Sequence, residues 1–349
     1  MKEIFGKRLK SARILAGLSQ SQLVERIKGK VSKNAISKYE KMEMMADSTV
    51  LLELSRALNV KLDYFFRPFT VEIKNVEFRK KQKLSVKELN SIKQNVTDFV
   101  ERYIEVEQFL NITSSFVNPV KDIHISTIQD INKAALKVRS EWQLGLNALP
   151  NVVDVLEDKN IKLIEVDAPD EFDGFSGWAD DKIPIIVINK NYKIERKRLT
   201  ALHELGHLIL NLKDGISTKE KERFCFQFAG AMLIPESTFK NELGNVRSYI
   251  SVPELVAVKE TYGISIQAIM ARAKDLKVIN ESQFISFRKF ITQNRTEEGM
   301  GNYKGREQTF RFNQLVNRAA AENVISMSKA ANLSNMKLSE FRKEFIELK

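Results

Sequence analysis

Residues 200–212 read TALHELGHLILNL and hold two of the three histidines in the 349-residue chain. The apolar residues around them recur at helical spacing, which predicts a helix through this stretch. On such a helix His203 and His207 stand one turn apart on the same face. Two imidazoles at this spacing can hold one metal ion, and Glu204 beside the first is placed to act as a general base. A pair of core histidines is the alternative interpretation.

A third protein ligand is needed, because catalytic zinc sites bind three protein groups and leave one position open. The remaining histidine, His124, lies in a linker-like segment well before this helix. A carboxylate on a nearby helix is therefore expected, with a three-histidine site as the alternative. In the next predicted helix, residues 217–235, Glu222 shares the inward face with apolar residues, whereas Glu220 points to solvent. Cys225 lies on the same face as a core residue or, alternatively, a soft ligand.

The composition indicates two or three domains and a basic N-terminal end. Apolar residues make up 43% and charged residues 29%, the balance of a globular protein. No apolar run approaches the roughly 18 residues of a membrane-spanning helix. Because there is also a single cysteine, we expect the protein in the cytoplasm, without a membrane partner.

Charge is concentrated at the start of the chain. Residues 1–90 hold 20 Lys or Arg against 10 Asp or Glu, so they carry +10 of the net charge of +11. This asymmetry predicts that the N-terminal end meets a polyanion. A basic surface kept for solubility is the alternative.

Residues 1–67 predict closely spaced short helices. Gly17 ends the first helix, Ser19 caps the second and Ser32 begins the third. Along SKNAISKYEK (32–41) apolar residues face inward while short polar and basic side chains face out. Such amide and ammonium groups suit base edges and phosphates in the major groove of double-stranded DNA. The residues expected to contact DNA are Gln20, Ser32, Lys33, Asn34, Ser37 and Lys38.

The segments LSQSQLVERI, VSKNAISKYEK and LLELSRALNVKLDYFF follow one another with the spacing of a helix-turn-helix domain. Together they resemble the lambda-repressor-like (XRE) family of DNA-binding domains over about residues 7–66. Met42 and Ala46 depart from this family, which usually has glycine and proline there. Both lie in the loop after the predicted recognition helix, so they affect the path of that loop more than the fold. A helical bundle that binds protein instead of DNA is the alternative.

After Pro68 the helical pattern breaks into a short alternating run. The basic residues expected to contact phosphates beside the groove are Arg79, Lys80, Lys81 and Lys83. From Ser85 to about Asn111 apolar residues recur at i, i+3, i+4 and i+7, which predicts a long amphipathic helix. Its apolar stripe either packs on the next domain or pairs two protomers as a homodimer.

The middle of the chain predicts a mixture of helices and strands. A helix around 127–145 is followed by a helix and strand in NVVDVLEDKNIKLIEVD and by short strands in FDGFSGWADDK and IPIIVINKN. We expect 183–189 (IPIIVIN) to be an edge strand, which would hold an extended peptide by backbone pairing. The turn-rich strand before it carries Asp173, Gly174, Ser176 and Trp178.

Four motifs occur in order here: DGFSGWAD, PIIVIN, RKRLTALHELGHLIL and KERFCFQFAGAMLIP. They resemble the ImmA/IrrE family of metallopeptidases over about residues 151–235. The resemblance implies Zn²⁺ as cofactor and puts the third metal-binding glutamate at Glu222, in agreement with its place on the inward face. Phe226 departs from the family, which usually has asparagine or aspartate there. If that polar group orients a metal ligand, metal affinity or turnover is reduced in this chain.

The C-terminal part predicts an exposed loop at 294–306 (NRTEEGMGNYKGR) and two or three helices in 312–348. The expected fold class is mainly α with a small β-sheet (α+β). The expected domains are a helix-turn-helix DNA-binding domain at 1–70, a basic linker and amphipathic helix at 71–126, a zinc metallopeptidase domain at 127–285, and a loop and helical region at 286–349.

These features predict a DNA-binding transcription regulator with a zinc-dependent endopeptidase domain. Glu204 is the expected catalytic base, and His203, His207 and Glu222 are the expected metal ligands. The family resemblance implies that the substrate is a specific protein, such as a transcriptional repressor. Two alternatives stay open: a regulator whose metallopeptidase fold acts as sensor or scaffold with little proteolysis, and an antitoxin-like protein-binding module.

Overall fold

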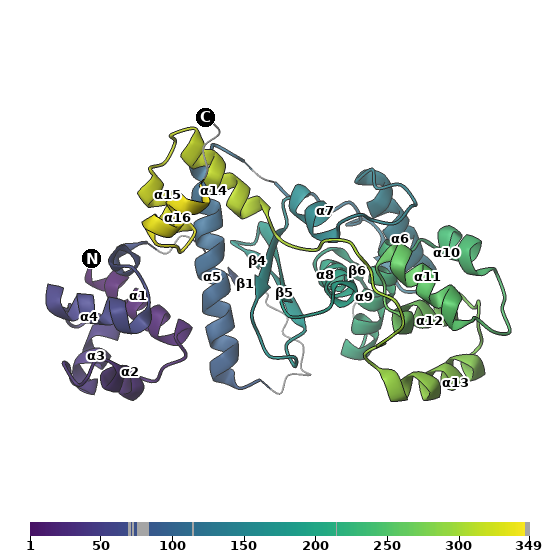
Figure 1. The fold of residues 1–349 in the computed structure, drawn as a ribbon, viewed down its shortest axis with the longest axis horizontal. Helices are drawn as coiled ribbons and strands as arrows, with labels where there is room; N and C mark the ends of the chain where they lie inside the picture. Colours follow the sequence, from purple (N-terminus) through teal and green to yellow (C-terminus); the bar gives the residue numbers. More distant parts are fainter. Residues whose placement is uncertain (69–70, 72, 75–83, 114, 214, 346–349) are drawn as a thin grey trace. The chain divides into compact units, whose positions relative to one another are not determined.

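Two units make up the chain in the computed structural model (Figure 1). One holds residues 1–73, 82–113 and 310–349, and the other holds 74–81 and 114–309. The structure describes residues 1–68, 71, 73–74, 84–113, 115–213 and 215–345. The predicted phosphate contacts Arg79, Lys80, Lys81 and Lys83 lie outside the described residues. Within the described ranges, no helix is both long and apolar enough to cross a bilayer.

The N-terminal part of the first unit is a bundle of short helices. They are α1 (Lys2–Leu15), α2 (Gln20–Arg26), α3 (Lys33–Glu40), α4 (Ser48–Leu58) and the 3-10 helix η1 (Leu62–Phe66). The hydroxyl of Ser19 accepts from the backbone N of Gln22 (3.2 Å), and that of Ser32 accepts from Ala35 (3.1 Å). Each serine thus satisfies an N–H that a helix start leaves without an intrahelical partner. Both predicted helix starts are confirmed.

The rest of the first unit combines one long helix with three helices from the C-terminal region. They are α5 (Val86–Phe109), α14 (Arg311–Ala321), α15 (Met327–Leu333) and α16 (Leu338–Glu344). Val106 of α5 is fully buried in one core with Val316 and Ala319 of α14. Packing within this unit therefore accounts for the apolar stripe of α5. Pairing of two protomers stays a prediction.

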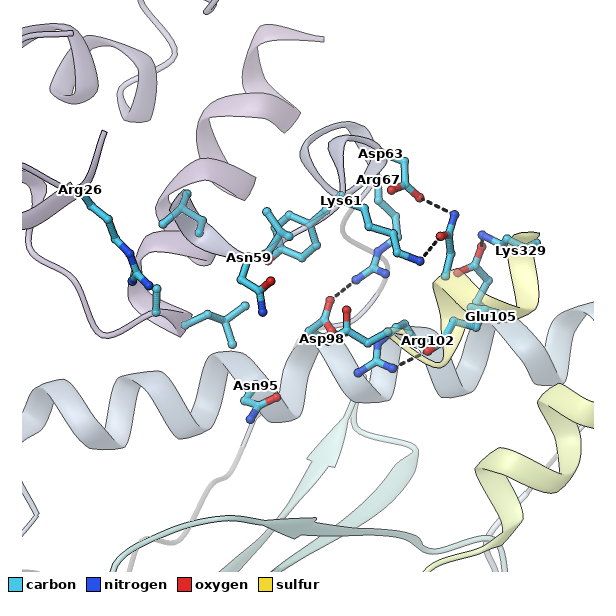
Figure 2. A pocket seen from close by; sticks show the side chains of 18 residues that line it. Arg26, Asn59, Lys61, Asp63, Arg67, Asn95, Asp98, Arg102, Glu105 and Lys329 are labelled. Atoms are coloured by element: carbon cyan, nitrogen blue, oxygen red, sulfur yellow. Dashed lines mark hydrogen bonds and ion pairs between the residues drawn. The ribbon is translucent and has the colours of Figure 1, made fainter. Parts of the chain in front are cut away.

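Charged side chains join the helix-turn-helix part to α5 and α15 within the first unit. Arg67, which follows η1, pairs with Asp98 of α5, and Arg102 donates to the same carboxylate at 3.0 Å. Lys61 donates to the side chain of Asn332 on α15. These five residues line a cavity of about 440 Å³ (Figure 2). Because a charge left alone in such a site is costly, the network holds the three segments together.

A small mixed sheet has the strand order β1-β4-β5-β3. The strands β3 (Lys162–Val166), β4 (Gly174–Ala179) and β5 (Ile183–Asn189) belong to the second unit, and the boundary between the units along the chain falls within β1 (Ile73–Lys74). β4 runs antiparallel to β5, and β3 runs parallel to it. A separate parallel pair joins β2 (His124–Ile125) to β6 (Asn211–Leu212).

β5 is a central strand, so the expectation that 183–189 form an edge was wrong. Ile186 of β5 pairs with Leu163 of β3 on one side and with Ser176 of β4 on the other. All residues from Ile185 to Ile188 are fully buried. A strand covered on both faces carries a continuous apolar run without alternation, which is the pattern of IPIIVIN.

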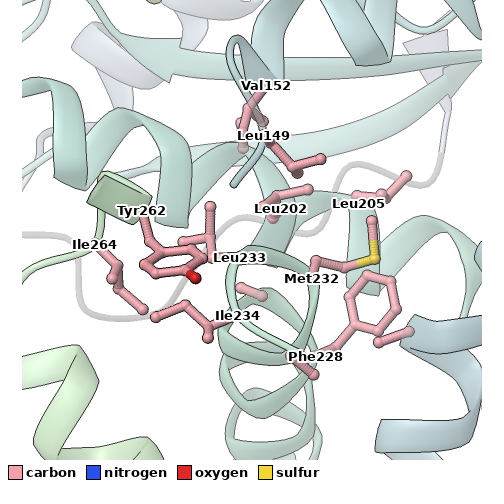
Figure 3. Packing of buried hydrophobic residues seen from close by; sticks show 14 of the residues in the cluster. Leu149, Val152, Leu202, Leu205, Phe228, Met232, Leu233, Ile234, Tyr262 and Ile264 are labelled. Atoms are coloured by element: carbon pink, nitrogen blue, oxygen red, sulfur yellow. The ribbon is translucent and has the colours of Figure 1, made fainter. Parts of the chain in front are cut away.

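The helices of the second unit make it α+β, as predicted. They are α6 (Ile128–Glu141), α7 (Val152–Asp158), α8 (Ile194–Ile209), α9 (Thr218–Leu233), α10 (Glu236–Leu243), α11 (Val252–Tyr262), α12 (Ile266–Asp275), α13 (Glu281–Ile291) and the 3-10 helix η2 (Thr292–Asn294). α7 and α8 pack directly on the strands of this sheet. Leu202 and Leu205 of α8 share one core with Phe228 and Met232 of α9 (Figure 3). This core fixes the two helices that carry the metal-site residues.

Residues 295–309, here called the strap, connect η2 to α14 without regular secondary structure. Glu307 is 2% exposed and accepts from the backbone N of Val152 and Val153, at 3.0 and 2.9 Å, at the start of α7. It also forms a buried ion pair with Arg198 of α8. A carboxylate at a helix start satisfies two N–H groups and the helix dipole together.

Glu297 repeats this arrangement at the start of α12. It is 4% exposed and accepts from the backbone N of Ile266 (3.1 Å) and Gln267 (3.0 Å), and Lys259 lies 3.0 Å away. The prediction of an exposed loop at 294–306 was therefore wrong for Glu297. Its burial depends on helix starts that are distant in sequence.

Candidate metal centre and DNA-binding surface

The HELGH motif lies in the last two turns of α8, inside the second unit. The Nε2 atoms of His203 and His207 are 3.0 Å apart, so both rings face one point from consecutive turns. His203 is fully buried, and the side chain of His207 is 5% exposed. The predicted common face of the two histidines is what the structure shows.

Glu222 reaches the same point from α9. Its Oε2 lies 3.5 Å from Nε2 of His203, and its Oε1 lies 3.4 Å from Nε2 of His207. The ligand atoms of the three residues are all within 4.8 Å of one another. Glu220, which was expected to point to solvent, is exposed and bonds the Ser217 hydroxyl at 2.9 Å in the cap of α9.

The three donor atoms fit a zinc ion. Zinc takes nitrogen and oxygen ligands at about 2.0–2.2 Å in a tetrahedron, which separates neighbouring ligand atoms by roughly 3.3 Å. The two imidazole nitrogens are 3.0 Å apart, and each has a different Glu222 oxygen at 3.5 or 3.4 Å, so all these separations are close to this value. Two imidazoles and one carboxylate are also the donor set of catalytic zinc sites.

The two alternative ligands lie elsewhere in the second unit. His124 is exposed in β2, where its Nδ1 is 3.3 Å from the side-chain amide of Asn211. Cys225 is fully buried between α9 and α8, and its Sγ packs near Gly206. Neither residue is part of the cluster formed by the two histidines and Glu222.

Glu204 is 1% exposed and accepts a hydrogen bond from the hydroxyl of Ser176 at 2.9 Å. Ser176 lies on β4, so strand and helix together fix the orientation of this carboxylate. The sequence placed Ser176 in a strand before the metal helix but did not reveal this contact. Which strand residue meets which helix residue depends on how β4 packs against α8.

Phe226 lies against the metal centre. Its ring centroid is 4.2 Å from that of His203 at an interplanar angle of 46°, and the residue is 41% exposed. An apolar ring thus borders a metal-site histidine at the position where the resembling family usually has a polar side chain. The ring covers one face of His203 and presents another surface to solvent.

The predicted DNA-binding residues lie along α3 and at the start of α2. Lys33, Asn34 and Lys38 are exposed, and Ser37 is half-buried. Ser32 caps α3. Gln20 also has a structural contact, because its side-chain amide donates to Glu40 at 2.9 Å. The exposed face of α3 therefore presents two ammonium groups and one amide, which suits contacts to phosphates and base edges.

Two family comparisons assign the bundle and the second unit to a class of protein: a helix-turn-helix regulator that carries a metallopeptidase-type domain. Residues 9–65 match a family model described as helix-turn-helix, and residues 156–274 match a peptidase family model described as IrrE N-terminal-like domain. The chain therefore combines these two domains, as the sequence motifs indicated. No curated protein is similar enough to count as a match.

Proposed function

We propose that this protein is a cytoplasmic transcription regulator that binds double-stranded DNA and cleaves a specific protein at a zinc centre formed by His203, His207 and Glu222. The observation that carries the proposal is the convergence of two imidazole nitrogens, 3.0 Å apart, with a carboxylate whose two oxygens lie 3.4 and 3.5 Å from them, beside a buried glutamate. This arrangement is typical of zinc peptidases with an HExxH helix.

Each residue has a separate role in peptide hydrolysis. Zinc held at this site would supply Lewis-acid chemistry to the peptide carbonyl and to the attacking water. The carboxylate of Glu204 accepts a proton from that water and then donates it to the leaving amine. The hydroxyl of Ser176, 2.9 Å from Oε2 of Glu204, keeps the carboxylate oriented for both transfers.

The DNA-binding part determines where the peptidase works. We expect the exposed face of α3 to enter the major groove, with Asn34 contacting base edges and Lys33 and Lys38 contacting phosphates. The substrate is then a transcriptional repressor bound at the same DNA. Because both domains belong to one chain, DNA binding raises the effective concentration of the peptidase at its substrate.

A second candidate function is a regulator whose metallopeptidase fold acts as a sensor or scaffold and cleaves little or no peptide. The observation that favours it is the ring of Phe226 at 4.2 Å from that of His203. A polar side chain at this position would be able to orient a ligand by hydrogen bonding, whereas a phenyl ring contributes packing only.

Incubation of the zinc-loaded full chain with the repressors encoded beside its gene separates the two candidates. The proposed function predicts a single cut in one repressor, detected by intact-mass spectrometry. Stoichiometric zinc binding without cleavage of any of these repressors would favour the sensor or scaffold.

A further inference from the structure

A groove of about 820 Å³ lies beside the candidate metal centre, along α9 and α12 within the second unit. Glu222 and Phe226 belong both to the metal centre and to the lining of this groove. The wall continues with Leu199 of α8, Ala268 of α12 and Phe284 of α13, all partly exposed. The exposed surface of the groove is mainly apolar, although polar and charged residues also line it.

Charged side chains of both signs border the groove. Lys219, Glu220 and Arg223 on α9 are exposed along it. The Ser217 hydroxyl donates to the Glu220 carboxylate and lowers its pKa, so this carboxylate keeps its charge. Selection at this groove therefore rests on its apolar surface and not on the charge of the flanking residues.

We propose that this groove binds a large apolar side chain of the substrate peptide beside the scissile bond, and that Phe226 is the residue that selects it. The inference rests on the proposed peptidase function and names the feature of the substrate that the site recognises. The occupant is an extended peptide with one Phe- or Leu-sized side chain.

Size and position support this occupant. The groove has room for a Phe-sized side chain, and it shares Glu222 and Phe226 with the candidate metal centre. Phe226 stands at the junction, 41% exposed, so that an apolar side chain placed there covers its ring. Apolar contacts of this kind discriminate side chains by about 10- to 200-fold.

Peptide binding to a non-cleaving variant provides the test. The full chain carrying Glu204→Gln is loaded with zinc and titrated into fluorescein-labelled heptapeptides of alanine, serine and terminal glutamates, with Phe, Leu, Ala or Lys at the centre. Fluorescence anisotropy reports affinity, and zinc content is measured in parallel. We expect the Phe and Leu peptides to bind at least about tenfold tighter than the Ala and Lys peptides.

The variants identify the selecting residue. Phe226→Asn is expected to reduce the preference to within about threefold at unchanged zinc content, and Phe226→Leu is expected to retain most of it. The matched control is Phe290→Asn, because Phe290 is 53% exposed on α13 and does not line this groove. This control should keep the full preference.

Equal affinity for all peptides, or no measurable binding, would overturn the inference, as would an unchanged preference in Phe226→Asn. These outcomes are distinct from failure of the proposed function, because binding is measured without cleavage. If the zinc-loaded parent chain cuts a repressor at a bond without a neighbouring large apolar residue, the peptidase function stands and the specificity inference is wrong.

Discussion

Gly206, inside the HELGH motif, sets how closely α8 approaches α9. A Cβ added there would lie 3.3 Å from both Cα and Cβ of Cys225, tighter than ordinary contacts. The close approach brings Glu222 across to the two histidines. Glycine is thus needed at this position for helix packing. This packing supports the candidate metal centre indirectly, because it sets the distance from Glu222 to the two histidines.

This contact predicts a difference between two buried helical glycines. Gly206→Ala should be less stable than Gly230→Ala by about 1 kcal/mol, because both gain the same helix propensity but only the first is crowded by backbone. At Gly230 the nearest atom to an added Cβ is Cδ of Arg272 at 3.5 Å, an ordinary contact. Both tryptophans of the chain, Trp142 and Trp178, belong to the second unit. Urea unfolding followed by tryptophan fluorescence therefore measures the difference in stability between the two variants. Equal midpoints for the two variants would contradict the packing account.

The metal-site assignment makes a prediction for Glu222. Glu222→Gln should lower zinc affinity by more than the roughly 10- to 100-fold that loss of a supporting hydrogen bond costs, because a direct ligand is removed. Glu220→Gln is the matched control on the same helix, since glutamine serves equally well at this position of a capping box. Competition with a fluorescent chelator measures both affinities. Equal affinities would show that Glu222 does not bind the metal.

At the scale of elements, the strap holds the metal helix. Arg198 lies five residues before His203 on α8 and is 1% exposed. Its guanidinium pairs with Glu307 and donates to the carbonyl oxygens of Leu149 and Tyr262, at 2.8 and 3.1 Å. Through Glu307 the strap connects the start of α7 to the second turn of α8, and through Glu297 it holds the start of α12.

Glu307→Gln should destabilise the second unit by about 3 kcal/mol or more, because it leaves the buried Arg198 without its charge partner. Glu298→Gln, an exposed change in the same strap, should alter stability by less than about 0.5 kcal/mol. Urea unfolding detected by tryptophan fluorescence compares the free energies of unfolding of the two variants with that of the parent chain. A loss below 1 kcal/mol for Glu307→Gln would mean that the strap does not support α8.

The elements also show what the sequence was able to predict. Starts at Ser19 and Ser32 follow from local capping chemistry, and the one-turn spacing of the histidines follows from helix geometry. The hydrogen bond from Ser176 to Glu204 was not predicted, because it depends on long-range packing. The contacts of Glu307 were not predicted either, because its partners are more than 100 residues away in the sequence.

At the scale of the whole molecule, the sequence predicted the order of domains better than their grouping in space. The helix-turn-helix and metallopeptidase-type domains occur where the motifs indicated. The C-terminal helices α14–α16 belong to the unit of the helix-turn-helix part, although some 200 residues separate them from α5. Apolar faces on distant helices do not identify their partners, so this grouping lay beyond sequence reasoning.

DNA binding should depend strongly on salt. We expect the logarithm of the association constant to fall linearly with the logarithm of salt concentration, and Lys33→Gln or Lys38→Gln to reduce the slope by about 1 each. Lys289→Gln, an exposed change on α13, is the control and should leave the slope unaltered. Fluorescence anisotropy with a DNA duplex from the promoter of the protein's own gene measures the association constant at each salt concentration. Slopes that are unchanged in both α3 variants would contradict the assignment of α3 to DNA.

The most direct test of the central claim is cleavage of a co-encoded repressor by the full chain and by Glu204→Gln, each loaded with one equivalent of zinc. Intact-mass spectrometry over time measures the rate. Loss of the general base should slow cleavage by about 100-fold or more while zinc content stays at one per chain. Equal cleavage by both proteins, or no cleavage by the parent chain at full zinc occupancy, would contradict the account.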